Sequence, residues 1–277
     1  MTRDPIRLGL IGDNIAASQM PRLQELAGDQ FGRPVRYARL IPREAGLDFD
    51  ALFDRCRAEG MRGVNVTYPY KERAAARVTA ADAGTKALGA VNTVLFEPDG
   101  PCGHNTDYSG FTEAYRAARG TSAPGTVCLI GTGGVGRAIA FALLALGGGP
   151  LRLADREAAK AEALAAELRA AGGRATVHPS AEAAAEGAAG LVNCTPVGMA
   201  GYEGTPLEAG AMRGAAWAFD AVYTPARTTF LRDAGRAGLG VISGWELFFW
   251  QGVHAAALYH GRAPDADALR AALREPA

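Results

Sequence analysis

A glycine-rich stretch near the middle of the chain constrains its fold more than any other feature. An apolar run from Val127 to Ile130 is followed by Gly131, Gly133 and Gly136, which fit the pattern G-x-G-x-x-G, and then by an alanine-rich helical pattern. In such a unit the first glycine makes a tight turn, the second lets backbone N–H groups approach a pyrophosphate, and the third lets helix and strand pack closely. The stretch therefore predicts a Rossmann-type dinucleotide-binding unit.

The next predicted strand favours a nucleotide site over the alternative, a Gly-rich turn with a purely structural role. This strand, residues 151–155, ends at Asp155, nineteen residues beyond Gly136, close to the spacing expected for a carboxylate that bonds the adenosine ribose. The start of the helix offers unpaired N–H donors to the phosphates. The predicted cofactor-binding residues here are Gly131, Gly133, Gly134, Val135, Gly136 and Asp155.

Composition limits the classes of partner. The 277 residues suit one large or two modest domains. Lys+Arg equal Asp+Glu at 29 each, so the chain has no net positive charge that would attract nucleic acid or an anionic membrane. The four cysteines are scattered without a C-x-x-C pair, which indicates neither a metal site nor a disulfide framework. Without a signal-peptide pattern or a long apolar run, the chain is expected to be cytoplasmic and to bind a small molecule.

The order of predicted elements indicates an α/β fold. Alternation of strands and helices before the glycine-rich unit argues for a mostly parallel, right-handed sheet, and residues 119–125 form a natural boundary. Strands are predicted at residues 8–12, 35–41, 63–67, 91–96, 127–130, 151–155, 191–195, 217–222 and 240–243. Helices are predicted at residues 21–27, 49–59, up to 88, 110–118, up to 146, up to 171 and 245–259.

Polar residues gather where predicted strands of the first half end. Ligands of open α/β sheets bind outside the carboxyl ends of the strands. Lys71 follows one such strand, Asn92 lies within the next, and Asp107 comes shortly after. A lysine near a carboxylate can exchange a proton with a hydroxyl that is being oxidised, so Lys71 and Asp107 make a plausible pair. Taken singly, Lys71 could be a solvated surface lysine and Asp107 a helix N-cap.

Several motifs resemble the shikimate/quinate dehydrogenase family, in the family's order and over nearly the whole chain. They are Asn65–Lys71 (N-V-T-Y-P-Y-K), Gly89–Thr93, Gly103–Gly110, the glycine loop, Asn193–Met199 and Asp220–Pro225. The resemblance implies a substrate-binding domain at residues 1–108, completed by a returning C-terminal helix at 244–277, and a Rossmann NAD(P)-binding domain at 109–243. It also implies hydride transfer that interconverts shikimate and 3-dehydroshikimate, or quinate and 3-dehydroquinate.

The resemblance also implies residue roles. Lys71 and Asp107 would form the catalytic pair, with Lys71 as the proton-transfer residue. The residues expected to bind substrate are Ser18, Thr67, Asn92, Tyr223 and Gln251. Further residues expected near the cofactor are Arg156, Thr195, Met199 and Gly244. The implied assembly is a monomer or a homodimer.

The chain departs from the family pattern in its first loop. The family usually has Ser-x-Ser-Pro or Ser-x-Thr-Pro followed by a histidine, and its two hydroxyls hold the substrate carboxylate. Here the loop is Ser18-Gln19-Met20-Pro21, with Gln24 at the histidine position. A hydrogen bond to a charged group is worth roughly 1.5–3 kcal/mol, so its loss predicts tenfold to hundredfold weaker carboxylate binding unless Gln19, Gln24 or a water compensates.

A second departure concerns the cofactor. NADP-preferring members place Asn-Arg at the end of the second Rossmann strand, where this chain has Asp155-Arg156. A carboxylate accepts hydrogen bonds from the ribose diol but repels a 2′-phosphate, so NAD is favoured while Arg156 keeps NADP possible. Two alternatives stay open: a paralogue that acts on a different cyclic hydroxy-acid, and a non-catalytic NAD(H)-binding protein.

Overall fold

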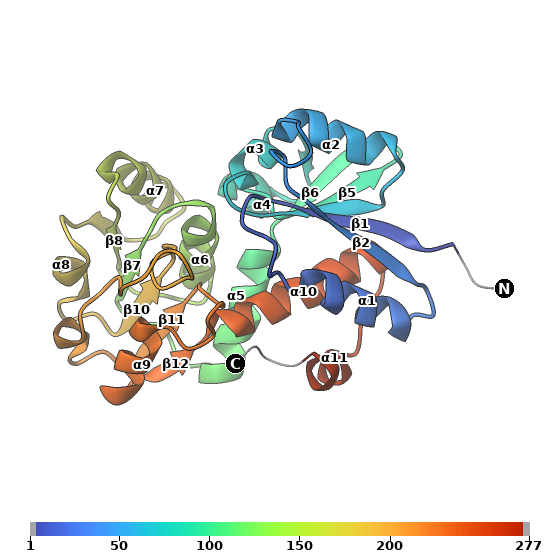
Figure 1. Ribbon diagram of the computed structural model, residues 1–277. Coiled ribbons are helices and arrows are strands. Elements are labelled where there is room, and N and C mark those ends of the chain that lie inside the picture. Colours follow the sequence, from blue (N-terminus) through green and yellow to red (C-terminus); the bar gives the residue numbers. More distant parts are fainter. Residues whose placement is uncertain (1–3, 274–277) are drawn as a thin grey trace. The chain divides into compact units, whose positions relative to one another are not determined.

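The computed structural model describes residues 4–273, which form two compact units (Figure 1). One unit contains the described residues up to Thr106 together with those from Gln251 onward, and the other contains residues 107–250. The chain leaves the first unit at the start of helix α5 (Thr106–Arg119) and returns to it within helix α10 (Gly244–His260). Each unit is built around its own six-stranded sheet.

The sheet of the first unit has the order β2-β1-β3-β5-β6-β4. Its strands are β1 (Ile6–Ile11), β2 (Val35–Leu40), β3 (Gly63–Val66), β4 (Thr79–Ala80), β5 (Thr93–Glu97) and β6 (Gly100–His104). Three pairs are parallel, but β5 runs antiparallel to both β3 and β6. Most pairs are thus parallel, as expected, and β5 is the exception, because the tight turn between β5 and β6 makes a hairpin that only antiparallel strands can form.

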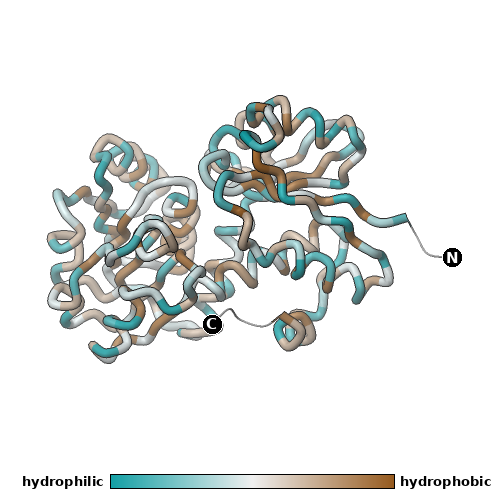
Figure 2. Tube along the Cα trace, in the orientation of Figure 1, coloured by the Kyte–Doolittle hydropathy of each residue, from teal (hydrophilic) through white to brown (hydrophobic). Residues whose placement is uncertain are grey.

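Helices pack on both faces of this sheet. They are α1 (Met20–Gln30), α2 (Phe49–Ala58), α3 (Lys71–Ala75), α4 (Ala83–Leu88) and the end of α10, whereas α11 (Ala266–Ala272) packs on α1. The α2 side chains expected from helical spacing are buried against one face, next to Val64 and Val94. The other face buries Leu8 and Leu95 against Tyr259 of α10. The hydrophobic stretches of Figure 2 follow these strands.

The second unit has the strand order β12-β11-β10-β7-β8-β9, and all its strand pairs are parallel. Its strands are β7 (Val127–Ile130), β8 (Leu151–Ala154), β9 (Ala175–Val177), β10 (Gly190–Asn193), β11 (Trp217–Asp220) and β12 (Gly240–Ile242). Its further helices are α6 (Gly134–Ala145), α7 (Ala158–Ala170), α8 (Ala181–Ala185), the 3₁₀ helix η1 (Ala209–Met212) and α9 (Thr229–Arg236). This is the doubly wound order of dinucleotide-binding folds, in which the strand sequence reverses between β7 and β10.

Candidate active site

The glycine loop of the second unit has the geometry that a dinucleotide site needs. Gly131 adopts φ +91°, which L side chains rarely adopt, and makes the turn after β7. A Cβ on Gly136 would lie 2.0 Å from the carbonyl oxygen of Gly131, so helix α6 approaches the turn closely. A Cβ on Gly133 would meet nothing within 4 Å, which leaves open space before the first N–H groups of α6. The loop therefore fits a pyrophosphate at the helix start.

Asp155 lies directly after β8 and is held by three hydrogen bonds. Its Oδ2 accepts from the backbone N–H of Thr132 at 2.7 Å and from the Thr132 hydroxyl at 2.8 Å, and its Oδ1 accepts from the N–H of Glu157 at 2.9 Å. Burial alone would raise the pKa of Asp155, but these hydrogen bonds outweigh it and hold the pKa below its usual value. The carboxylate is thus fixed beside the glycine loop as an anion.

The remaining residues predicted for the cofactor lie in loops of the same unit. Thr195 donates its N–H and its hydroxyl to Oδ1 of Asn193, at 2.9 and 2.7 Å, in the loop after β10. Met199 lies further along this loop, and its N–H donates to the carbonyl oxygen of Pro196. Gly244 is buried at the first position of α10, and Arg156 is exposed.

Asn92 is the centre of a buried polar network in the first unit. It stands one residue before β5 and not within the strand as predicted, because the β3–β5 pairing ends at Thr93. Its Nδ2 donates to the Thr106 hydroxyl at 3.0 Å and to Oε1 of Gln251 at 3.1 Å. Its Oδ1 accepts from the N–H of Thr106 at 2.6 Å. The network therefore joins Gln251 on α10 to Asn92 and, through it, to Thr106, both of which are far from Gln251 in sequence.

Sequence analysis did not assign roles to three further members of this network. Asn65 on β3 donates from Nδ2 to the Thr93 hydroxyl at 3.0 Å, and its Oδ1 accepts from the hydroxyl of Tyr37 on β2 at 2.8 Å. Thr93 and Thr106 lie 3.1 Å apart through their hydroxyl oxygens. Asn65 and Thr93 belong to motifs named above, and their polarity within otherwise apolar strands was a further signal, since a buried amide requires polar partners.

Lys71 and Asp107 each occupy the first turn of a helix and are buried. Lys71 begins α3 and is 8% exposed, and its backbone carbonyl accepts from the N–H of Val91 at 2.9 Å. Asp107 follows Thr106 in α5 and is 1% exposed. The surface-lysine interpretation of Lys71 is therefore wrong. Burial of ionisable groups at helix starts is costly and typical of functional positions.

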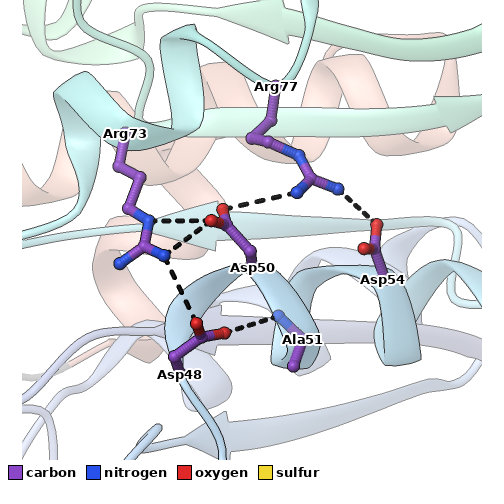
Figure 3. A network of polar contacts seen from close by, with 6 residues as sticks. All are labelled: Asp48, Asp50, Ala51, Asp54, Arg73 and Arg77. Carbon is purple, nitrogen blue, oxygen red and sulfur yellow. Dashed lines mark hydrogen bonds and ion pairs between the residues drawn. The ribbon is translucent and has the colours of Figure 1, made fainter.

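A charged network holds α3 against α2 on the outside of the first unit (Figure 3). Arg73 donates to Oδ2 of Asp50 through Nε at 3.1 Å and through Nη2 at 2.6 Å. Arg77 pairs with Asp50 at 3.4 Å and with Asp54 at 2.5 Å. Asp48 caps α2 and also contacts Arg73 at 3.5 Å. The network ties the short helix that carries Lys71 to a longer, well-packed one.

Comparisons with known proteins agree with this architecture. Residues 10–94 match the family described as the shikimate dehydrogenase substrate binding domain. Over 279 residues the chain is 36% identical to a quinate/shikimate dehydrogenase (NAD(+)) of Corynebacterium efficiens, covering 98% of each chain. The structure of quinate dehydrogenase from Corynebacterium glutamicum in complex with NAD is similar with a TM-score of 0.86 at 33% identity, covering 97% of this chain and 98% of that one.

The chain belongs to the shikimate/quinate dehydrogenase family. Shikimate 5-dehydrogenase from Thermus thermophilus, in complex with NADP(H) and shikimate, gives a TM-score of 0.83 at 35% identity, covering 97% of this chain and all of that one. Membership confirms the resemblance, the α/β fold class and the class of enzyme expected from the sequence, an NAD(P)-dependent oxidoreductase acting on a CH–OH group.

The first loop of this family member shows how its departure from the pattern is accommodated. The Ser18 hydroxyl accepts from the N–H of Met20 at 3.2 Å. Gln24 is fully buried and donates from Nε2 to the carbonyl oxygen of Gly252 at 3.0 Å and to the Met20 sulfur at 3.4 Å. Its Oε1 is buried without a hydrogen-bond partner. Both hydrogen bonds donated by Gln24 Nε2 are made inside the unit, so Gln24 does not replace the missing hydroxyl.

Two further residues of the sequence motifs are His104 and Tyr223. His104 is half-buried, and burial lowers its pKa, so it is neutral near pH 7 and suits packing better than proton transfer. Tyr223 stacks on Phe248 of α10, with ring centroids 4.8 Å apart.

No cluster of three or more His, Cys, Asp or Glu that could hold a metal occurs among residues 4–273. Within the same range, no helix is long and apolar enough to cross a membrane.

Proposed function

We propose that the chain oxidises a ring hydroxyl of shikimate or quinate, giving the 3-dehydro acid, and catalyses the reverse reduction. The substrate is bound by the polar network of the first unit, and the dinucleotide by the glycine loop of the second. The sequence-based limits of the two functional domains, 1–108 with 244–277 and 109–243, are part of this proposal. Relatives named quinate/shikimate dehydrogenase (NAD(+)) and shikimate dehydrogenase (NADP(+)) support it.

Lys71 and Asp107 are the catalytic pair of this proposal. Lys71 accepts the proton of the ring hydroxyl as the carbon is oxidised, and returns it to the carbonyl oxygen in the reverse reaction. Asp107 stabilises the protonated lysine. The bound NAD(P)⁺ supplies the acceptor for the hydride. The burial of each side chain supports these roles, because an ionisable group shielded from water interacts more strongly with its surroundings and is held in a fixed position.

The substrate hydroxyls bind to side chains around the Asn92 network. Gln251 and Asn92 already contact each other, so a diol that bridges them meets a preformed array of amides. Thr67 directly follows β3, and Ser18 precedes α1. Tyr223 is part of the proposal as a further substrate-binding residue. The Asn92 network is the single observation that carries the proposal, because it converges amide and hydroxyl groups at the carboxyl end of β3.

NAD is the preferred cofactor of this proposal. Asp155 is an anion fixed by three hydrogen bonds, so it cannot turn away from a 2′-phosphate without losing them. Thr195, Met199 and Gly244 lie near the nicotinamide, and exposed Arg156 allows residual use of NADP.

The direct test is turnover by the purified protein. Formation of NADH or NADPH is followed at 340 nm with millimolar shikimate or quinate under alkaline conditions, which favour oxidation. We expect turnover with at least one acid and a higher kcat/KM with NAD⁺ than with NADP⁺. Binding of NADH without turnover of any cyclic hydroxy-acid would support the non-catalytic alternative and contradict the proposal.

A second candidate is a paralogue for a different cyclic hydroxy-acid, which Met20 favours. The Met20 thioether stands at the position of a carboxylate-binding hydroxyl, and Gln24 does not compensate for it. If shikimate is the substrate, Met20→Ser should lower its KM about tenfold, since the new hydroxyl adds one hydrogen bond to a carboxylate. Met20→Leu, which adds no donor, is the control. An unchanged KM in the serine variant would show that position 20 does not contact the carboxylate.

A further inference from the structure

Arg39 lies on the same face of the first sheet as the polar network. In the parallel pairing of β2, β1 and β3, Leu10 is the register partner of Arg39 on one side and of Asn65 on the other. Side chains in register across parallel strands point to the same face, and strands lie about 4.8 Å apart. Arg39 is therefore level with Asn65, two strands away, at the carboxyl end of the sheet.

Tyr37 shows that side chains of β2 reach this network. It precedes Arg39 by two residues, so the two share a face, and its hydroxyl donates to Oδ1 of Asn65 at 2.8 Å. Asn65 in turn contacts Thr93 and the carbonyl oxygen of Asn92. Arg39 stands one step further toward the strand end, where ligands of α/β sheets bind.

The guanidinium of Arg39 is placed at the first loop. Its Nη2 donates to the carbonyl oxygen of Ser18 at 2.9 Å. A guanidinium has five N–H donors, so four remain available. Arg39 forms no ion pair with any carboxylate of residues 4–273. A cation without a counterion beside Ser18 gives the loop a net attraction for anions.

We propose that Arg39 binds the carboxylate of the substrate and is a specificity-determining residue for cyclic hydroxy-acids over neutral polyols. This inference rests on the proposed function. Ser18 holds one carboxylate oxygen through its hydroxyl, and Arg39 supplies the charge and the forked donors that Met20 and Gln24 do not. The fork of a guanidinium matches the two oxygens of a carboxylate.

The experiment compares Arg39→Ala with Arg36→Ala. Arg36 lies on the same strand but points to the opposite face, so its loss controls for removing a surface charge from β2. Steady-state kinetics are measured with shikimate and with its neutral methyl ester, and shikimate binding is measured by calorimetry. Arg39→Lys, which keeps the charge but not the fork, is the second variant. Thermal unfolding of each variant checks that it is folded.

We expect Arg39→Ala to raise KM and Kd for shikimate by roughly 10- to 100-fold, with kcat within about threefold. The methyl ester should be bound equally by wild type and variant, and Arg39→Lys should lie between them. Salt should weaken shikimate binding in the wild type more than in Arg39→Ala. Equal effects of Arg39→Ala on acid and ester, or effects no larger than those of Arg36→Ala, overturn the inference. A wild type that turns over neither acid overturns the proposed function, and this role with it.

Discussion

At the residue scale, buried or fixed charges distinguish this chain from an ordinary two-unit α/β protein. Lys71 and Asp107 are buried in the first turns of helices, and Asp155 lies directly after a strand, where backbone N–H groups fix its carboxylate. Arg39 has no carboxylate partner among the described residues and stands beside Ser18. These positions link the sequence motifs to the chemistry of an acid substrate and a dinucleotide.

Asp155 should control the choice of cofactor. Asp155→Asn removes the negative charge that repels a 2′-phosphate, while its side-chain oxygen can still accept from Thr132. We expect the ratio of kcat/KM with NADP⁺ to that with NAD⁺ to rise by about 10-fold or more, since each tenfold corresponds to about 1.4 kcal/mol. Asp155→Glu, which keeps the charge, is the control. An unchanged ratio in the asparagine variant would show that discrimination resides elsewhere.

Much of the site could be predicted from the sequence, because its motifs are local. The roles of the glycine loop and the position of Asp155 follow from spacing alone, and the structure shows the turn, the close approach and the open space that they require. The Tyr37–Asn65 and Arg39–Ser18 contacts could not be predicted. They depend on which strands are neighbours and in what register, and short-range patterns do not encode register between distant strands.

At the element scale, helix α3 depends on contacts outside itself. It has only five residues, and helices of this length are not stable alone in water. Arg73 and Arg77 fasten it to α2 through three aspartates, and their guanidinium groups lie 5.7 and 5.4 Å from the ring centres of Phe49 and Phe53. The ion pairs are partly exposed, so their strength comes from the network and not from any one pair.

Arg73→Ala should therefore destabilise the first unit modestly. We expect a small loss in unfolding free energy at low salt, which shrinks at high salt as the charges are screened. Urea unfolding at the two ionic strengths measures it. Arg57→Ala, an exposed arginine of α2 without an ion pair in the described chain, should show neither the loss nor the salt effect. A loss that does not depend on salt would contradict the electrostatic account.

The elements also show where sequence patterns fail. Predicted helices and strands with clear apolar spacing exist, such as α2 and β7, because burial dictates their pattern. Strands β4 and β6 were not predicted. β4 has two residues, and β6 contains glycine and proline, so neither carries a periodic signal, and both exist only through pairing with neighbours. The hairpin of β5 and β6 is the reason that the first sheet is mixed.

At the scale of the whole molecule, each unit has its own core and its own buried polar network. In the second unit, buried Asp220 accepts hydrogen bonds from Asn193, Val222 and Thr228. Burial raises the pKa of Asp220 to about 6, although these hydrogen bonds oppose the rise. Because the folded state holds this proton more tightly than the unfolded chain, the contribution of Asp220 to stability is largest below pH 4 and falls as the pH rises to 6.

The raised pKa of Asp220 predicts how the unfolding free energy changes with pH. Relative to Asp220→Asn, the wild type should lose about 2 kcal/mol of unfolding free energy between pH 4 and pH 6, out of about 3 kcal/mol for the whole transition, since a shift of about two pH units is worth 1.36 kcal/mol per unit. Asparagine is a suitable reference, since its oxygen can accept from Asn193 and Val222 while its amide faces the Thr228 hydroxyl. Urea unfolding across this pH range measures the difference. A difference that stays constant with pH would show that Asp220 keeps an ordinary pKa.

Steady-state kinetics of Lys71 variants test whether this side chain transfers the proton of the ring hydroxyl, the step on which the proposed function depends. Lys71→Ala should lower kcat for shikimate or quinate oxidation by on the order of 10²–10⁴, with KM for the acid and Kd for NADH little changed, because only the proton-transfer step loses a group. Lys86→Ala, an exposed lysine on α4, should behave as wild type. A Lys71→Ala variant that retains kcat within threefold of wild type would contradict the account.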